Sequence, residues 1–289
     1  MNKIVWLASY PKSGNTWVRI FLNNYLLNGE APADINKMPE GLHSSTRALF
    51  DRLTGVESSD LTPTEIDQIR PFMYQRWAKE SSETLFVKVH DAWRRNDGGE
   101  SLFPGAATKT AVYIIRNPLD IVASLANHYS LSLDEAISTL ADESYALASS
   151  VEKLNRQLPQ FVGSWHAHVT SWANQREMPL HLIRYEQLCC QPEQTFKQLI
   201  QAVGLPFDLP RLEKAIRFSS FDQLKQQETA VGFAERRPNS PMFFRQGKSG
   251  GWQHELSQNQ IATVCNNHRN VMQQFGYLNE EDQPIISND

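Results

Sequence analysis

Apolar residues occur along the chain in two kinds of run, which predict strands and helices in alternation. Four short runs rich in β-branched or aromatic residues predict buried strands at residues 4–8, 85–89, 111–115 and 180–183. Longer stretches with apolar residues three or four apart predict helices over residues 16–27, 63–79, 118–128, 133–142, 161–177, 192–203, 209–218 and 257–275. Strands that alternate with helices are typical of a parallel sheet covered by helices. We therefore expect an α/β fold with a central, mostly parallel sheet flanked by helices, and ligands beyond the carboxyl ends of the strands.

Three stretches lack steady periodicity and predict surface segments: residues 29–61, 91–109 and 229–251. An irregular stretch as long as the last is uncommon in a compact domain unless it is disordered or forms a lid over a site. No linker separates two apolar cores, so we expect residues 1–289 to form a single domain.

Composition and charge narrow the class of protein. Hydrophobic residues make up 40% and charged residues 21% of the 289 residues, which is typical of a globular enzyme. The net charge of -4 argues against a broad nucleic-acid or acidic-membrane surface, so any anion site must be local. The three cysteines, two of them adjacent, do not form a disulfide framework and favour a reducing compartment. The apolar runs are too short for a signal peptide or a membrane span, and we expect a cytoplasmic protein.

The loop after the first predicted strand combines the features of an anion site. Its sequence is Tyr-Pro-Lys-Ser-Gly-Asn-Thr-Trp, residues 10–17, and a predicted helix follows. Backbone N–H groups and the positive end of the helix dipole point at a group bound there, Lys12 adds a mobile charge, and Thr16 adds a hydroxyl. The Walker A pattern is absent because the lysine precedes the glycine. Taken alone, Lys-Ser-Gly before a helix also fits a plain capped turn.

A second junction between a strand and a helix carries Arg116 at the end of the third predicted strand. Asn117 suits the N-cap of the next helix and Pro118 its first position, while Ser124 lies two turns further on. Arginine is well suited to bidentate phosphate contact. By itself, a strand-terminal arginine paired with a surface carboxylate is an equally good interpretation.

Lys88 and His90 end the second predicted strand and project to the same side, because successive side chains on a strand alternate. A histidine with a pKa near neutrality can take a proton from a hydroxyl or phenol. A lone histidine at a strand end is otherwise satisfied by a neighbour. The other histidines present no such pattern: His166 and His168, two apart on a predicted helix, point to different sides and make a poor metal pair.

Together these strings resemble the sulfotransferases that use 3'-phosphoadenosine 5'-phosphosulfate (PAPS). Residues 10–17 resemble the family's 5'-phosphosulfate-binding loop, a P-loop-like element, with Asn15 where most cytosolic relatives have threonine. Residues 116–124 resemble the motif in which an arginine and a serine hold the 3'-phosphate. The Lys-x-His pattern implies that His90 is the general base and that Lys88 assists near the transferring group.

Three further segments match the family in the same order. Residues 182–188 resemble a segment whose tyrosine, here Tyr185, contacts the adenine. Ser219-Ser220-Phe221 resembles the Thr-Ser-Phe that borders the adenine, so Phe221 is implied to stack on the base. Without the resemblance, both aromatic side chains would be ordinary core residues.

The last match, residues 244–252, resembles the loop Arg-Lys-Gly-x-x-Gly-Asp-Trp with two departures. Gln246 replaces the usual lysine and Gly251 the usual aspartate, although Lys248 could supply the missing charge. No segment matches the Lys-Thr-Val-Glu dimerisation motif of cytosolic relatives, which leaves the oligomeric state open.

The resemblance implies sulfuryl transfer from PAPS to a hydroxyl or phenol of a small-molecule acceptor, with PAP as the second product and no metal, nucleic acid or membrane partner. The implied catalytic residues are His90, Lys12 and Lys88. The implied cofactor-binding residues are Lys12, Ser13, Gly14, Asn15, Thr16, Trp17, Arg116, Ser124, Tyr185, Ser219, Phe221, Arg245, Gln246 and Gly247.

The acceptor class and two alternative functions stay open. The Ser-Gly-Asn-Thr-Trp loop is also similar to that of bacterial sulfotransferases that tailor natural products. A nucleotide-dependent phosphoryl-transfer enzyme would need a Walker-type Lys-Ser/Thr pair and a magnesium-binding aspartate, and neither is evident. A non-catalytic PAP-binding protein would not need Lys12 and His90.

Overall fold

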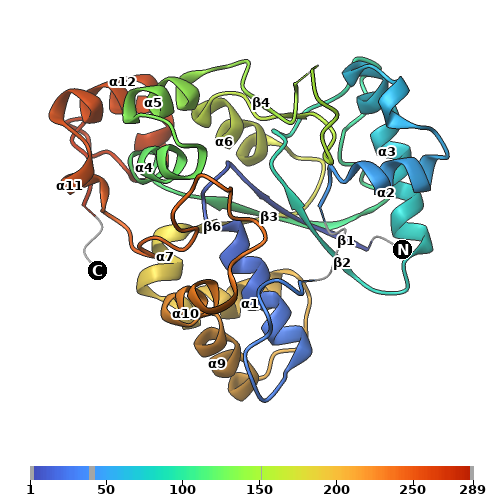
Figure 1. The fold of residues 1–289 in the computed structure, drawn as a ribbon, viewed down its shortest axis with the longest axis horizontal. Helices are drawn as coiled ribbons and strands as arrows, with labels where there is room; N and C mark the ends of the chain where they lie inside the picture. The colour runs from blue at the N-terminus through green and yellow to red at the C-terminus, as the bar shows by residue number, and fades with distance from the viewer. Residues whose placement is uncertain (1–2, 39–42, 151, 287–289) are drawn as a thin grey trace. The chain divides into compact units, whose positions relative to one another are not determined.

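The central feature of the computed structural model, which describes residues 3–38, 43–150 and 152–286, is a parallel four-stranded sheet flanked by helices (Figure 1). Its strand order is β2-β1-β3-β6, and its strands are β1 (Ile4–Ser9), β2 (Leu85–Val89), β3 (Thr108–Ile115) and β6 (Leu180–Arg184). A small antiparallel pair joins β4 (Ala146–Leu147) to β5 (Gln160–Phe161). The predicted α/β fold is confirmed, and each of the four predicted strands is present.

Strand β1 is the buried centre of the sheet. All six of its residues are buried, as expected for a parallel strand covered on both faces. It pairs with β2 in parallel register from Ile4 opposite Leu85 to Ala8 opposite Val89. The carboxyl ends of these two strands therefore lie next to each other, and His90 follows directly after one of them.

Each of the eight predicted helices is present, and all but one agree with the predicted ranges to within one residue; four further helices of the described residues lie outside those ranges. The helices are α1 (Asn15–Leu27), α2 (Arg47–Thr54), α3 (Pro63–Glu80), α4 (Pro118–Tyr129), α5 (Leu133–Ala141), α6 (Trp165–Asn174), α7 (Tyr185–Cys190), α8 (Pro192–Ala202), α9 (Leu209–Phe218), α10 (Phe221–Val231), α11 (Trp252–Glu255) and α12 (Gln258–Gln274), with a 3-10 turn η1 (Ser58–Asp60). The exception is the helix predicted over 161–177. It starts only at Trp165, because the Ser164 side chain caps it and Phe161 pairs in β5.

Two helices occupy stretches that the sequence predicts to be irregular. Helix α2 buries Leu49, Phe50 and Leu53, a short apolar stripe that a window of eleven or more residues does not resolve. Helix α10 continues to Val231, so the irregular stretch predicted from residue 229 begins three residues later, at Gly232.

Residue contacts divide the chain into two compact units. The first comprises residues 1–10, 41–113 and 143–182, and the second residues 11–40, 114–142 and 183–289. Lys88 and His90 belong to the first unit, whereas all the residues predicted to bind PAPS belong to the second. The single domain expected over residues 1–289 stays a prediction. No helix in the described part of the chain is long and apolar enough to cross a membrane.

Candidate functional site

The loop after β1 has a backbone conformation that few side chains tolerate. Lys12 has a φ of 69° and Gly14 a φ of 98°, both in the left-handed region. A Cβ atom on Gly14 would lie 2.7 Å from Cδ2 of Tyr185. Glycine is therefore required at position 14 both by conformation and by the approach of the tyrosine ring. Left-handed backbone at a lysine is a form of strain that proteins concentrate at functional sites.

The start of helix α1 offers hydrogen-bond donors that the described residues do not use. Gly14 is the N-cap, and no described side chain caps the helix. The Ser13 hydroxyl is buried, and no partner for it exists among the described residues; the same is true of Trp17 Nε1. Buried polar groups ordinarily have partners, and a helix N-terminus favours an anion. The residues present therefore fit a phosphosulfate group.

Arg116 connects three parts of the second unit. Its Nη1 donates to the carbonyl oxygen of Lys12 at 3.1 Å, and its Nη2 to that of Lys248 at 3.4 Å. The guanidinium also lies over the Tyr185 ring, 4.0 Å from the centroid. Burial opposes its charge, but interactions with Tyr185 and Asp120 raise the pKa of Arg116 above its usual value. A charged arginine thus lies beside the predicted phosphosulfate loop, and its contact with a 3'-phosphate stays a prediction.

Arg245 and Gln246, in the C-terminal loop, both contact Glu255. Arg245 Nη1 lies 2.8 Å from Glu255 Oε2, and Gln246 Nε2 lies 2.8 Å from Oε1. A Cβ atom on Gly251 would come within 2.6 Å of Gln246 Oε1. The two departures from the family pattern are therefore linked: glycine at position 251 leaves room for the glutamine side chain.

Of the residues predicted at the adenine, Phe221 contacts the same loop. A Cβ atom on Gly247, which has a φ of 64°, would overlap the Phe221 ring at 2.1 Å. Ser219 instead uses its hydroxyl to donate to the carbonyl oxygen of Ala215 at 2.7 Å at the end of α9. Ser124 is half-buried on α4. Its predicted contact with a phosphate, like that of Ser219 with adenine, stays a prediction.

Two glutamates that sequence reasoning missed hold the segment 232–251: Glu235 joins it to the loop after β1 and the start of α1, and Glu228 joins it to α10. Glu235 accepts from Thr16 Oγ1 at 3.2 Å and from Arg19 Nη1 at 2.7 Å. The buried carboxylate of Glu228 accepts from the backbone N–H groups of Phe243 and Phe244 at 2.7 and 2.8 Å. Neither contact leaves a signal in the sequence, because each joins residues that no local pattern relates.

The Lys12 ammonium also contacts this segment, 4.0 Å from the centroid of the Phe243 ring. A contact between a cation and an aromatic ring is weak, so the ammonium can exchange the ring for an anionic partner that binds it more strongly. The lysine, its loop and the segment 232–251 thus form one group of contacts within the second unit.

In the first unit, the structure fixes the tautomer of His90. His90 Nδ1 lies 2.9 Å from the carbonyl oxygen of Ser9. Because a carbonyl only accepts, Nδ1 carries a proton, and in the neutral imidazole Nε2 is then the nitrogen with the lone pair. The His90 carbonyl in turn accepts from His168 Nε2 at 3.1 Å, and His168 Nδ1 accepts from the Tyr113 hydroxyl at 2.8 Å. Burial lowers the pKa of His168 to about 4, so it is neutral at neutral pH.

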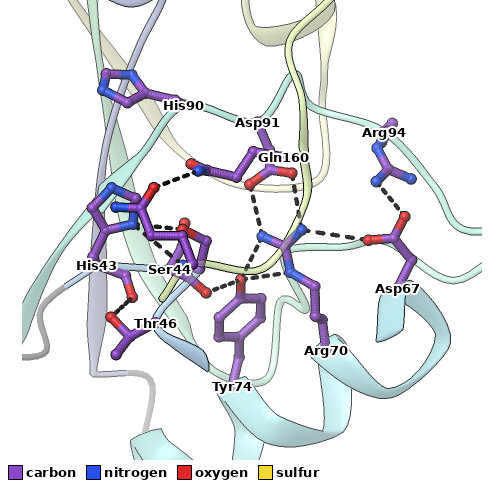
Figure 2. A network of polar contacts seen from close by, with 12 residues as sticks. His43, Ser44, Thr46, Asp67, Arg70, Tyr74, His90, Asp91, Arg94 and Gln160 are labelled. Atoms are coloured by element: carbon purple, nitrogen blue, oxygen red, sulfur yellow. Dashed lines mark hydrogen bonds and ion pairs between the residues drawn. The ribbon is translucent and has the colours of Figure 1, made fainter. Parts of the chain in front are cut away.

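His43 is a neighbour of His90 that the sequence did not identify (Figure 2). The two ring centroids are 6.2 Å apart, and His43 Nδ1 accepts from the backbone N–H of Ser45 at 3.3 Å. Lys88 is half-buried on β2, and its carbonyl oxygen accepts from the N–H of Ser44 at 2.9 Å. Within residues 3–38, 43–150 and 152–286, no three His, Cys, Asp or Glu side chains gather as metal ligands would.

Comparison with known proteins identifies the family of the chain and agrees with the fold. A family model described as "Sulfotransferase domain" matches residues 2–276. Sulfotransferase 2A6 of Rattus norvegicus is 27% identical over 255 residues, which cover 87% of this chain and 78% of that protein. Flavonol 3-sulfotransferase of Flaveria bidentis is 23% identical over 275 residues, which cover 90% of this chain and 78% of that protein. The crystal structure of mouse sulfotransferase SULT7A1 complexed with PAP shares the fold, with a TM-score of 0.56 and 16% identity over 94% of this chain and 85% of that one.

Proposed function

This chain belongs to the sulfotransferase domain family, and we propose that it transfers a sulfuryl group from PAPS to a hydroxyl or phenol of a small-molecule acceptor. One observation carries the proposal. The buried Ser13 hydroxyl, with no partner among the described residues, lies at the N-terminus of α1, where no described side chain acts as a cap. Arg116 bonds to the same loop through the Lys12 carbonyl. These donors suit a phosphosulfate.

The donor-binding residues have separate roles in this proposal. PAPS supplies an activated sulfuryl group when it is bound. Ser13 and the first N–H groups of α1 hold the phosphosulfate, and Lys12 neutralises charge that develops on the leaving oxygen. Arg116, Ser124 and Arg245 hold the 3'-phosphate. Tyr185 and Phe221 border the adenine.

His90 is the general base of the proposed reaction. Its Nε2 lone pair accepts the proton of the acceptor hydroxyl, while Nδ1–H stays on the Ser9 carbonyl and keeps the ring oriented. Lys88, two residues earlier on β2, assists near the transferring group. The sulfuryl group carries less charge than a phosphoryl group, so these side chains do the positioning and charge stabilisation without a metal.

The acceptor class and the cellular location are the finer parts of the proposal. The relative from Flaveria bidentis is named for flavonols, which carry phenolic hydroxyls, and this supports a phenol or alcohol acceptor. A natural product of bacterial type and a cytoplasmic location are proposed on the resemblance of the loop and on cysteine usage alone.

A thermal-shift series tests the donor. PAPS and PAP should raise the melting temperature, because a ligand that binds only the native state stabilises it. Adenosine 5'-phosphosulfate, which lacks the 3'-phosphate, should raise it far less. Equal shifts from PAP and adenosine 5'-phosphosulfate would contradict the assignment of Arg116.

Incubation with PAPS and pools of alcohols and phenols, read by mass spectrometry, tests the reaction itself. Acceptors that gain one sulfuryl group, with turnover that survives excess EDTA, are the expected result. Loss of activity on chelation with recovery on adding magnesium would favour phosphoryl transfer. Binding of PAP without any sulfated product would favour a non-catalytic protein.

A further inference from the structure

A fully buried ion pair of the first unit joins Arg70 to Asp91, the residue directly after His90 in the chain (Figure 2). Arg70 lies on α3, and both side chains are 0% exposed. The contact is bidentate, with Arg70 Nη1 2.9 Å from Asp91 Oδ1 and Nη2 2.7 Å from Oδ2. Tyr74 accepts from Arg70 Nη2 at 2.9 Å and donates to the Ser44 carbonyl at 2.9 Å.

The ion pair is one of several contacts that fix the chain segment His90–Asp91 in place. The carbonyl oxygen of Asp91 accepts from Trp172 Nε1 at 3.0 Å, and that of His90 accepts from His168. With the His90 ring on the Ser9 carbonyl, four separate contacts fix these two residues. Burying such a pair costs desolvation energy that its attraction barely offsets, so stability alone does not explain it.

The pair also matters for the charge around the imidazole. A lone buried carboxylate at position 91 would favour the protonated His90, and a lone buried guanidinium would disfavour it. Bidentate pairing cancels most of both effects. The desolvation of Arg70 opposes its charge, but Asp91 and its other neighbours raise the pKa of Arg70 well above its usual value.

Within the described part of the first unit, further charged or titratable groups near this segment include His43 beside the ring, Lys88 on β2, the neutral His168 on α6 with its partner Tyr113, Tyr74 on α3, and the ion pair of Asp67 with Arg94. Asp67 also lies 3.4 Å from Arg70 Nη1, so it adds to the neutralisation of that guanidinium.

We propose that Arg70 and Asp91 are positioning residues for His90: together they fix its ring on the Ser9 carbonyl and leave its basicity undisturbed by either charge. The inference rests on the proposed role of His90 as general base.

Nitrogen-15 NMR of the histidine side chains tests it without any acceptor, with the His90→Gln variant to assign the resonance. Asp91→Asn leaves the guanidinium with only the more distant Asp67, which Arg94 shares, and should lower the pKa of His90 by about 0.5–1 unit. Arg70→Met leaves the carboxylate without its partner and should raise it by about the same amount. The double variant removes both charges and should return the pKa to within about 0.3 unit of the wild type.

A control and a rate measurement separate the effects of charge and of position. Arg76→Met, on the same helix, breaks an exposed ion pair with Glu80 and should leave the His90 titration unchanged. In the double variant, which restores the pKa but not the contacts, we expect turnover to fall about 10- to 100-fold while PAP-induced stabilisation is kept.

Single variants that keep PAP-induced stabilisation but do not move the pKa in opposite directions would overturn the inference. Should the single variants not fold, the wild type decides: the spectrum must show neutral His90 protonated at Nδ1, and protonation at Nε2 overturns the proposal. If His90→Ala retains turnover on an alcohol, the general-base assignment is wrong, while the titrations still decide what Arg70 and Asp91 do.

Discussion

Glu255 accepts a hydrogen bond from Arg245, with 2.8 Å between Oε2 and Nη1. The same carboxylate accepts from Gln246. The arginine proposed to hold the 3'-phosphate thus already has an anionic partner, which a phosphate must replace or share.

Removing the charge of Glu255 should therefore strengthen PAP binding. The pair is partly exposed, so the expected gain for Glu255→Gln is about two- to fivefold in affinity. Calorimetric titration with PAP measures it, and Glu280→Gln, an equal charge change at an exposed site, is the control. Unchanged or weaker binding in Glu255→Gln would mean that Glu255 does not compete with the nucleotide.

Alanine at position 14 should disrupt the loop after β1. The new Cβ would both require a left-handed backbone and meet the Tyr185 ring at 2.7 Å. Gly55→Ala is a matched control, since Gly55 has a φ of 75° but open space around it, and should cost only about 1 kcal/mol. Urea unfolding should show the greater loss for Gly14→Ala, with PAP-induced stabilisation lost as well. Equal losses in both variants would count against the close packing.

Arg116→Ala should weaken PAP binding by about 1.5–3 kcal/mol, the scale of a charge-assisted hydrogen bond. It should also bring the thermal shift with PAP down to that with adenosine 5'-phosphosulfate. Arg116→Lys keeps the charge but loses the two-pronged contact with the carbonyls of Lys12 and Lys248, so we expect an intermediate affinity. A PAP preference that survives in Arg116→Ala would place the 3'-phosphate elsewhere.

His168 should make the protein sensitive to acid. Burial lowers its pKa from 6.5 to about 4, so the unfolded chain takes up a proton that the folded protein refuses. The contribution of neutral His168 to the free energy of unfolding is fully present above pH 6.5. It is lost as the pH falls towards 4, by up to about 3 kcal/mol. Denaturant unfolding of His168→Gln should show a shallower loss over this range than wild type or the exposed control His254→Gln. An unchanged pH slope would show that His168 does not cause the acid sensitivity.

The segment 232–251 should be protected from protease by PAP, because it carries the loop proposed to hold the 3'-phosphate. Glu228→Gln weakens the acceptor for the Phe243 and Phe244 N–H groups and should speed cleavage in the absence of PAP. Glu213→Gln, on the exposed side of α9, is the control. Cleavage that is the same with and without saturating PAP would contradict a role as a lid.

Local patterns were sufficient for the four strands of the main sheet and for eight of the helices, but not for the short elements between them. Asn117 and Pro118 predict the start of α4 because a cap and a missing N–H are properties of one short segment, and the Asn117 side chain indeed accepts from the Leu119 N–H. Strand β2 ends at Val89, as its alternating pattern predicts.

Contacts between residues far apart in the sequence could not be predicted from local patterns. Glu228 lies 15 residues from Phe243, and His168 lies 78 residues from the carbonyl that it holds. Each partner alone looks ordinary: a glutamate inside a helix, or a histidine judged only as a poor metal ligand. Their roles depend on tertiary packing, which neither composition nor periodicity encodes locally.

The division of the chain into two units has a consequence for how such a protein diversifies. The residues proposed to bind PAPS fall in one unit, and His90 with its supporting pair falls in the other. On the proposed function, substitutions in the segments around His90 would alter the surroundings of the general base without touching the groups proposed to hold the donor. Descendants of one ancestral chain would then keep a common sulfuryl source while their acceptors drift apart.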